Sequence, residues 1–359
     1  MSGPRPVDEL LEEFPKNKVV REALIKTHDH ISRAARNAHE NLSGVSGGSD
    51  SDIILDFFER IGYPDGLVYY AWYDTGLEYE ATKRHLRYLE ERYGVTIHRH
   101  RGTLTVAQAV KRYGAPFRSK KDSQYIGYLQ RHDFGWEEIC NNGYKADEYW
   151  WNGNGRISVG HSLGLKEFMI ANPPEFRISD QCCYHTKKKT SAKVEKEIGA
   201  TLVCMGMRKA EGGVRSVVLD SCFSEATNKR VARFYPIFWF SDEDKQEYKE
   251  YFGIAYSDCY EKWGFKRTGC ACCPFASNFE EELAIVKVEE PKLYAAANKI
   301  FGESYEYSRR FREFKTAFKK ERSEKLRIAR EKRKNEKRKA KRAEERARRE
   351  AEKQEEGRG

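Results

Sequence analysis

The segment NLSGVSGGSDSDIILDFFERIG, residues 41–62, changes abruptly from a glycine- and serine-rich stretch to an apolar periodic one. Glycine and serine tolerate a tight turn with exposed backbone N–H groups. The apolar residues that follow recur at helical spacing, namely Ile53, Ile54, Phe57, Phe58 and Ile61. Free N–H groups at a helix N-terminus, together with the positive end of the helix dipole, attract anions. The segment therefore predicts a phosphate-binding loop that leads into an amphipathic helix.

The surrounding sequence predicts strands that alternate with helices. We expect a helix at 20–40, a strand at about 41–45, the helix after the loop, and a strand at 66–76. A helix at 78–94, a strand at 95–101 and a further buried strand at 200–208 follow. Such alternation is typical of an α/β fold with a doubly wound, mainly parallel sheet.

The composition limits the classes of protein to which the chain can belong. Of the 359 residues, 39% are hydrophobic, which is enough for a sizeable core. No apolar run reaches the length of a membrane span, and the first residues lack the apolar core of a signal peptide. We expect a cytoplasmic protein with an N-terminal helical segment at 1–37, an α/β domain at 38–300 that includes the cysteines, and a charged tail at 301–359.

The net charge of +10 is concentrated in the tail, because residues 319–359 hold 19 Lys and Arg against ten Glu. Many opposite charges there are three or four residues apart, which predicts a long, solvated single helix. No apolar seam is sustained, so a coiled coil is not expected. Two interpretations stay open, a solubilising helix and an element that docks DNA or RNA.

The nine cysteines predict metal binding or thiol chemistry rather than disulfides, since the expected compartment is reducing. Cys182 and Cys183 are adjacent, and Cys270 and Cys273 form a C-x-x-C motif. Four thiolates near one point suit a [4Fe–4S] cluster or Zn²⁺, and inert buried thiols are the remaining alternative. Cys272 is a candidate reactive thiol, whereas the isolated cysteines are interpreted as core residues: Cys140, Cys204, Cys222 and Cys259.

Other candidate ligands follow the predicted strands. Asp74, Thr75 and Gly76 come after the second strand, where parallel strands present ligand-binding groups. Arg208 and Arg215 are candidates for binding phosphate or sulfate, because a guanidinium group matches such oxyanions in bidentate fashion. The alternative is that both arginines lie on the surface.

Together and in this order, the motifs resemble the PAPS-reductase-like family of the PP-loop ATP pyrophosphatase (adenine nucleotide alpha hydrolase-like) superfamily, over about residues 38–280. The resemblance implies a HUP/PP-loop type fold and an iron–sulfur site at the four paired cysteines. It also implies that an adenine nucleotide is held by Asp74, Thr75, Gly76, the two arginines and the phosphate loop, which consists of Ser46, Gly47, Gly48, Ser49, Asp50 and Ser51. Asp50 is expected to help hold Mg²⁺.

The chain departs from the sulfonucleotide reductases of this family in two respects. It has no cysteine after Cys273, and it keeps the complete SGGxDS loop. Both departures favour an ATP-dependent sulfurtransferase of the phosphorothioation or thiolation type, with Asp50 and Cys272 as candidate catalytic residues. Such an enzyme would adenylylate a substrate oxygen and then replace AMP by sulfur, supplied by a donor such as a cysteine desulfurase.

Two alternatives remain open. One is a PAPS or APS reductase, an oxidoreductase that relies on an external thiol. The other is a non-catalytic metal-binding protein attached to nucleic acid through the tail. The sequence names neither the acceptor nor the oligomeric state.

Overall fold

The computed structural model describes residues 4–36, 41–63, 66–131, 163–212, 219–228 and 230–356. The chain divides into two compact units. The first comprises residues 1–127 and 176–304, and the second comprises residues 128–175 and 305–359. The sheet and the predicted phosphate loop belong to the first unit.

The first unit is built on a six-stranded sheet with the order β3-β2-β1-β4-β6-β5. Its strands are β1 (Asn41–Gly44), β2 (Val68–Asp74), β3 (Ile97–Arg101), β4 (Leu202–Cys204), β5 (Phe223–Ser224) and β6 (Ala232–Phe234). Every neighbouring pair is parallel except β5 with β6. The prediction of a mainly parallel sheet is thus confirmed, whereas the two-residue strand β5 carried too little sequence pattern to be predicted.

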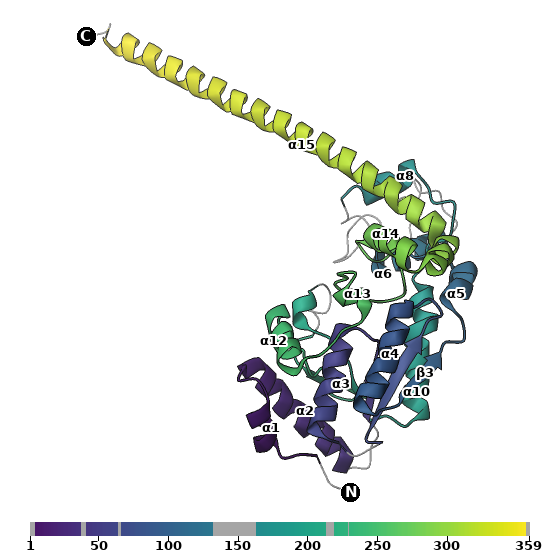
Figure 1. Ribbon diagram of the computed structural model, residues 1–359. Coiled ribbons are helices and arrows are strands. Elements are labelled where there is room, and N and C mark those ends of the chain that lie inside the picture. Colours follow the sequence, from purple (N-terminus) through teal and green to yellow (C-terminus); the bar gives the residue numbers. More distant parts are fainter. Residues whose placement is uncertain are drawn as a thin grey trace. The chain divides into compact units, whose positions relative to one another are not determined.

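Apolar side chains alternate between the two faces of the sheet. On β2, Tyr70 and Trp72 join the larger core and Ala71 joins a smaller one. The larger core is closed by α1 (Val7–Glu13), α2 (Lys18–Arg36), α3 (Ser49–Ile61), α4 (Glu80–Tyr93) and α12 (Asp242–Phe252). Helix α10 (Lys189–Glu197) supplies the smaller core on the opposite face. Figure 1 shows α3 and α4 side by side in one layer.

Because these strands are parallel, their carboxyl ends meet at one edge of the sheet. The strand order reverses between β1 and β4, which are hydrogen-bonded neighbours with Leu42 opposite Val203. Ligands of open α/β sheets bind in the crevice outside such a reversal. The loops that follow β1, β2, β4 and β6 all reach this edge.

Shorter helices complete the fold: α5 (Val106–Tyr113), α6 (Lys120–Gln130), α8 (Leu165–Ala171), α9 (Gln181–Cys183), α13 (Asp258–Glu261) and α14 (Phe279–Glu289). A π-helical turn (Tyr184–Lys188) joins α9 to α10, and a 3₁₀ turn (Lys209–Glu211) follows β4. Glu290, just after α14, accepts hydrogen bonds from the backbone N–H groups of Glu80 and Ala81 at 2.9 and 3.0 Å. This carboxylate caps the N-terminus of α4 and ties the chain beyond the C-x-x-C motif to the sheet layer.

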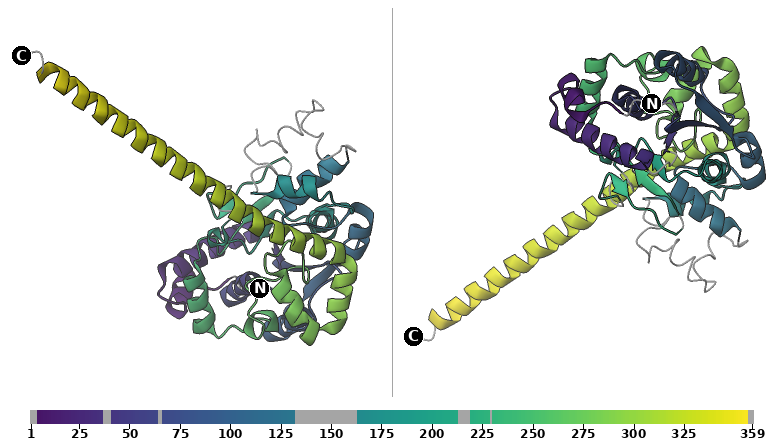
Figure 2. Two further views of the ribbon diagram at one scale, coloured as in Figure 1. Left: turned by 90° about the horizontal axis from the view of Figure 1, so that it is seen from above. Right: turned by 90° about the horizontal axis from the view of Figure 1, so that it is seen from below.

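The long helix α15 (Pro291–Glu356) is continuous (Figure 2). Its early residues Ala297 and Phe301 are buried, whereas residues 319–345 are all exposed. Arg327 pairs there with Glu324 and Glu331, at spacings of three and four residues. The predicted solvated helix is therefore confirmed. None of the described helices combines the length and the apolar character that a membrane span requires.

Deleting residues 319–359 is expected to change the free energy of unfolding of the remaining chain by less than about 0.5 kcal/mol, because exposed residues with surface ion pairs contribute little. Circular dichroism would follow urea unfolding of both chains, and the truncated chain would show less helical signal per molecule. A loss of more than about 1 kcal/mol would contradict the solvated character of this segment.

Candidate functional site

The predicted phosphate loop lies between β1 and α3, at the carboxyl edge of the sheet. Gly47 has a φ of +66°, and a Cβ atom there would lie 2.9 Å from Cγ2 of Thr82. A Cβ on Gly48 would lie 3.2 Å from Oγ of Ser46 and 3.3 Å from Oη of Tyr260. The glycines thus let the backbone turn sharply in a crowded place, and they leave its N–H groups accessible at the helix N-terminus.

A polar cavity of about 430 Å³ opens beside this loop. Gly44, Gly206, Thr268, the loop and a ring of charged or polar side chains line it. The charged members are Asp50, Arg208, Glu211, Asp242, Lys245, Lys266 and Arg267. Cations on three separate segments thus face the helix N-terminus, which is the environment that phosphate groups prefer.

Asp50 is the centre of an ion-pair network in this polar cavity. One of its carboxylate oxygens lies 2.6 Å from Nζ of Lys245 and 3.2 Å from Nε of Arg208. Arg208 also reaches Asp242 at 2.9 Å, and Lys245 donates a hydrogen bond to Oγ of Ser49. Asp50 therefore holds two cations in position, beyond the metal-binding role expected from the sequence.

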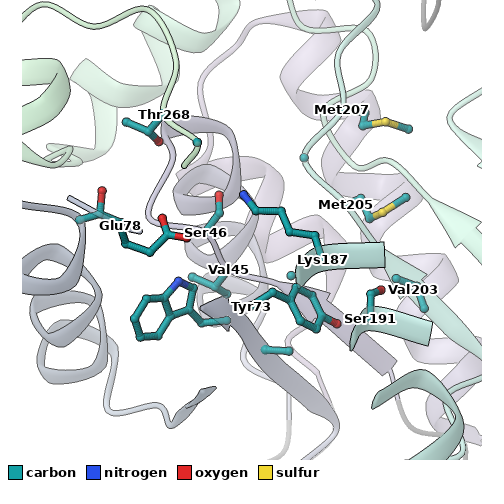
Figure 3. Close-up of a pocket in the computed structure, with 16 residues that line it drawn as sticks. Val45, Ser46, Tyr73, Glu78, Lys187, Ser191, Val203, Met205, Met207 and Thr268 are labelled. Carbon is teal, nitrogen blue, oxygen red and sulfur yellow. The ribbon is translucent and has the colours of Figure 1, made fainter. Parts of the chain in front are cut away.

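An apolar cavity of about 340 Å³ adjoins the polar one and shares Gly44, Ser46, Gly206 and Thr268 with it. Its walls are mostly apolar: Val45, Ala71, Trp72, Tyr73, Val203, Met205 and Met207. Figure 3 shows Glu78, Lys187 and Ser46 reaching into this space. An apolar chamber with a few polar groups beside a cationic chamber fits a ligand that has a flat ring at one end and phosphates at the other.

Lys187 and Glu78 connect the apolar cavity to the cysteines. Thr75 donates hydrogen bonds to Glu78 from Oγ1 at 2.6 Å and from its backbone N–H at 3.3 Å, and burial raises the pKa of Glu78. The proximity of Cys270, followed by that of Glu78, raises the pKa of Lys187, which stays charged. Lys187 therefore lines the apolar cavity and also lies near the C-x-x-C motif.

The four paired cysteines come close enough to influence one another electrostatically. The hydrogen bond with Cys182 lowers the pKa of Cys183, and the ammonium groups of Lys120 and Lys187 lower it further. Burial raises the pKa of both Cys270 and Cys273. Ionisation is thus favoured at Cys183 and opposed at the other cysteines.

The metal-binding region expected from the sequence is not seen. Within the part of the chain that the structure describes, no three His, Cys, Asp or Glu side chains are grouped so that they could hold a metal ion. Cys182 is 4% exposed and belongs to the interior, and its thiol is hydrogen-bonded to that of Cys183. The donor types suit a cluster, but they are not grouped as a bound metal ion requires.

Cys272 lies in an environment that opposes the predicted reactive role. Its side chain is fully buried, and burial raises the pKa of its thiol to about 12. The backbone N–H of Cys272 donates a hydrogen bond to Oη of Tyr79 at 3.0 Å. Because the thiolate is the nucleophilic form, these surroundings keep Cys272 inert.

The segment formed by Asp74, Thr75 and Gly76 supports the site without lining either cavity. Asp74 accepts a hydrogen bond from the N–H of Gly76 at 2.8 Å and pairs with Arg99 and Arg101. Asp74, Thr75 and Gly76 are absent from the lining of both cavities. Thr75 instead contacts Glu78 and lies 3.4 Å from Sγ of Cys270, so the segment positions other groups.

Two residues named in the sequence analysis, Arg215 and Cys140, lie outside the described residues. Conversely, the sequence analysis did not select Glu78, Lys187, Lys245 or Thr268. Glu78 lies three residues beyond Thr75, which is a local signal. Lys245 contacts Asp50 although the two residues are 195 positions apart in the sequence, and no local sequence pattern predicts that contact.

Comparisons with known proteins give one family match. Residues 162–276 match the family model of the phosphoadenosine phosphosulfate reductase domain. This match includes both cysteine pairs and Arg208, and it begins after the phosphate loop. A search of curated proteins found no match.

Three solved structures resemble the chain. A phosphoadenylyl-sulfate (PAPS) reductase from Candida auris, in a phosphate complex, is 15% identical, with 74% of this chain and 93% of that chain covered and a TM-score of 0.40. The U34-tRNA thiolase NcsA from Methanococcus maripaludis with its [4Fe-4S] cluster is 14% identical, with coverages of 83% and 82% and a TM-score of 0.35. An NAD+ synthetase from Burkholderia pseudomallei is 14% identical, with coverages of 71% and 77% and a TM-score of 0.32. Likenesses at this level do not bear on the activity.

The loop that carries the C-x-x-C motif is linked through Tyr79 to the carboxyl group of Glu282, whose ionisation opposes folding. Glu282 is buried, accepts a hydrogen bond from Oη of Tyr79 at 2.9 Å, and has its pKa raised to about 7 by burial. Because the folded state holds a proton that the unfolded state releases from about pH 4.5, stability falls as the pH rises through this range to about 7.

Glu282→Gln is expected to remove this dependence, so that the variant gains stability relative to the wild type as the pH is raised. Urea unfolding at a series of pH values between about 5 and 8 measures the effect. The matched control is Glu281→Gln, since Glu281 is the exposed neighbour on the same helix. Parallel pH profiles for the wild type and Glu282→Gln would contradict the assignment.

Proposed function

Since the chain carries a phosphoadenosine phosphosulfate reductase domain of the adenine nucleotide alpha hydrolase-like (PP-loop) superfamily, we propose that it is an enzyme that binds ATP and transfers the adenylyl group to an oxygen atom of its substrate. The observation that carries this proposal is the polar cavity. There the N-terminus of α3, Arg208 and Lys245 face the same space. The adjoining apolar cavity has the size and lining for adenosine.

The proposed reaction is a displacement at the α-phosphorus of ATP. The acceptor oxygen forms a bond to that phosphorus, the bridging bond to the β-phosphate breaks, and pyrophosphate leaves with the electron pair. Arg208 and Lys245 stabilise the charge that develops on the leaving group. Mg²⁺ would neutralise the phosphates, and the oxygen donors of Asp50 and of the loop serines are of the type that it prefers.

For the second half of the reaction we propose sulfur transfer. A sulfur nucleophile attacks the carbon or phosphorus atom that carries the adenylylated oxygen, the bond to that oxygen breaks, and AMP leaves. The sulfur comes from an external donor such as a cysteine desulfurase. Cys183 is the best candidate to receive it as a persulfide, because its neighbours favour the thiolate. After the outer persulfide sulfur has attacked and AMP has left, an external thiol reductant cleaves the bond between the two sulfur atoms, which leaves one sulfur on the acceptor and regenerates Cys183.

The alternative role of the four paired cysteines is to bind a [4Fe–4S] cluster or Zn²⁺. Cys183 would then be a ligand and not the sulfur carrier, and the thiols would have to move together, because they are not grouped for a metal ion in the described residues.

The family match also supports a second candidate, a PAPS or APS reductase. The two functions differ in their products. With ATP and an acceptor the first releases pyrophosphate and AMP, whereas with PAPS and a reduced thiol the second releases sulfite. The exposed basic end of α15 is a candidate docking element for a nucleic-acid acceptor in the first case, and has no evident use in the second.

Asp50→Asn is expected to weaken the binding of ATP–Mg²⁺ while leaving the binding of metal-free pyrophosphate equal or stronger, because the change frees Arg208 and Lys245 from their carboxylate partner. Lys245→Met is expected to weaken the binding of both ligands. Calorimetric titration with and without Mg²⁺ measures both effects.

The control for these variants is Lys249→Met, since Lys249 lies one turn further along α12 and pairs with Glu261 instead. Unchanged affinities in both Asp50→Asn and Lys245→Met would exclude the polar cavity as the phosphate site.

The proposed metal site has its own test. If the four paired cysteines bind a cluster, protein purified without oxygen contains iron and absorbs near roughly 400 nm. Four variants are each expected to lower the iron content: Cys182→Ser, Cys183→Ser, Cys270→Ser and Cys273→Ser. The control Cys222→Ser is expected to leave the iron content unchanged. A colourless protein that holds one zinc per chain would indicate a structural zinc site. A protein that holds neither iron nor zinc would contradict this part of the proposal.

A further inference from the structure

Trp239 is a large aromatic side chain left exposed at the edge of the sheet that carries the site. It follows β6, and 45% of its surface is accessible, while its neighbours Phe238 and Phe240 are buried. Nζ of Lys209 lies 4.9 Å from the centre of the indole ring. The two buried phenylalanines fix the backbone on both sides, so the exposed ring is presented from a rigid segment.

Hydrogen bonds join this exposed ring to the wall of the polar cavity. The backbone N–H of Lys209 donates to the carbonyl of Phe238 at 2.8 Å, and Nη1 of Arg208 donates to that of Phe240 at 3.3 Å. Lys209 lies between Arg208 and Ala210, which both line the polar cavity. Trp239 and Lys209 are therefore neighbours of the cavity wall.

Further positive charge lies on another part of the wall. Lys266 and Arg267 line the polar cavity, and both are exposed. An exposed aromatic ring beside Lys209, with further exposed cations on the wall of the same cavity, is a pairing that single-stranded nucleic acids recognise. The bases stack on the ring, and the phosphates contact Lys and Arg. An aromatic peptide would use the ring but would have no need of the cations.

We propose that Trp239 and Lys209 form a stacking platform for a base of a single-stranded nucleic acid, whose phosphates contact Lys266 and Arg267. The platform holds the strand at the polar cavity, so that a neighbouring nucleotide is the acceptor. Its role in acceptor choice rests on the proposed function, whereas its binding of nucleic acid does not.

The test uses the full-length protein and fluorescently labelled single-stranded DNA and RNA of about 12 nucleotides, with fluorescence anisotropy at several salt concentrations. Trp239→Ala is expected to weaken binding at least five-fold, the loss of about 1 kcal/mol that one stacked base accounts for at minimum. Trp239→Phe is expected to retain most of the affinity. Lys266→Met is expected to reduce the salt dependence by about one released ion, because Lys266 is proposed to contact a phosphate.

The matched control is Tyr251→Ala, because Tyr251 is 55% exposed on α12 and lines neither cavity. Its affinity is expected to equal that of the wild type. Three outcomes would each overturn the platform. The first is an equal affinity of Trp239→Ala and Tyr251→Ala for the oligonucleotide, and the second is no binding by the wild type. The third is that duplex DNA or RNA competes as strongly as the single strand.

A separate readout distinguishes failure of the platform from failure of the proposed function. ATP affinity, measured by calorimetry, is expected to be the same in Trp239→Ala and the wild type, which also shows that the variant is folded. If the wild type binds oligonucleotides through Trp239 but does not bind ATP, the proposed function fails and the platform stands. If ATP binds and the Trp239 effect is absent, only the platform fails.

Discussion

The ion pairs of Asp50 with Arg208 and Lys245 hold the candidate site together, because they join three segments that are far apart in the chain. Asp50 comes from the first turn of α3, Arg208 from the segment after β4 and Lys245 from α12. The three side chains are each less than one-fifth exposed, so the charges are largely withdrawn from water. Removing one partner from such a buried group typically leaves an uncompensated charge, at a cost of about 3–5 kcal/mol. A ligand phosphate that takes over the two cations must therefore offer a comparable negative charge.

The order of the elements could be predicted because it depends on local patterns. The switch from glycine and serine to helical periodicity located both the loop and α3, and the alternation of strands and helices predicted the parallel sheet. The end of the chain was equally clear, since α15 carries opposite charges at helical spacing. In contrast, β5 is two residues long and has no periodicity to detect.

The site was only partly predictable, because its contacts cross long stretches of sequence. The phosphate loop and Arg208 line the polar cavity as expected. Lys245 contributes because α12 packs against α3 through Tyr248, whose Oη donates to Asp56 at 2.8 Å. Motif spacing brought the cysteines into one neighbourhood but could not show the direction of each thiol. The direction of the Cys182 thiol depends on the burial of that residue in the interior, which motif spacing does not encode.

The backbone of Cys272 has a consequence for how this segment tolerates sequence change. Its φ of 52° places an L-residue in the left-handed region, which costs roughly 1–2 kcal/mol. A glycine would adopt that conformation without strain, whereas a β-branched residue would force the chain back to right-handed geometry. The turn between Cys270 and Cys273 would then open, and Cys270 would move away from Thr75. Position 272 thus affects the backbone conformation of the motif, and a valine there would disturb both flanking thiols although Cys272 lines neither cavity.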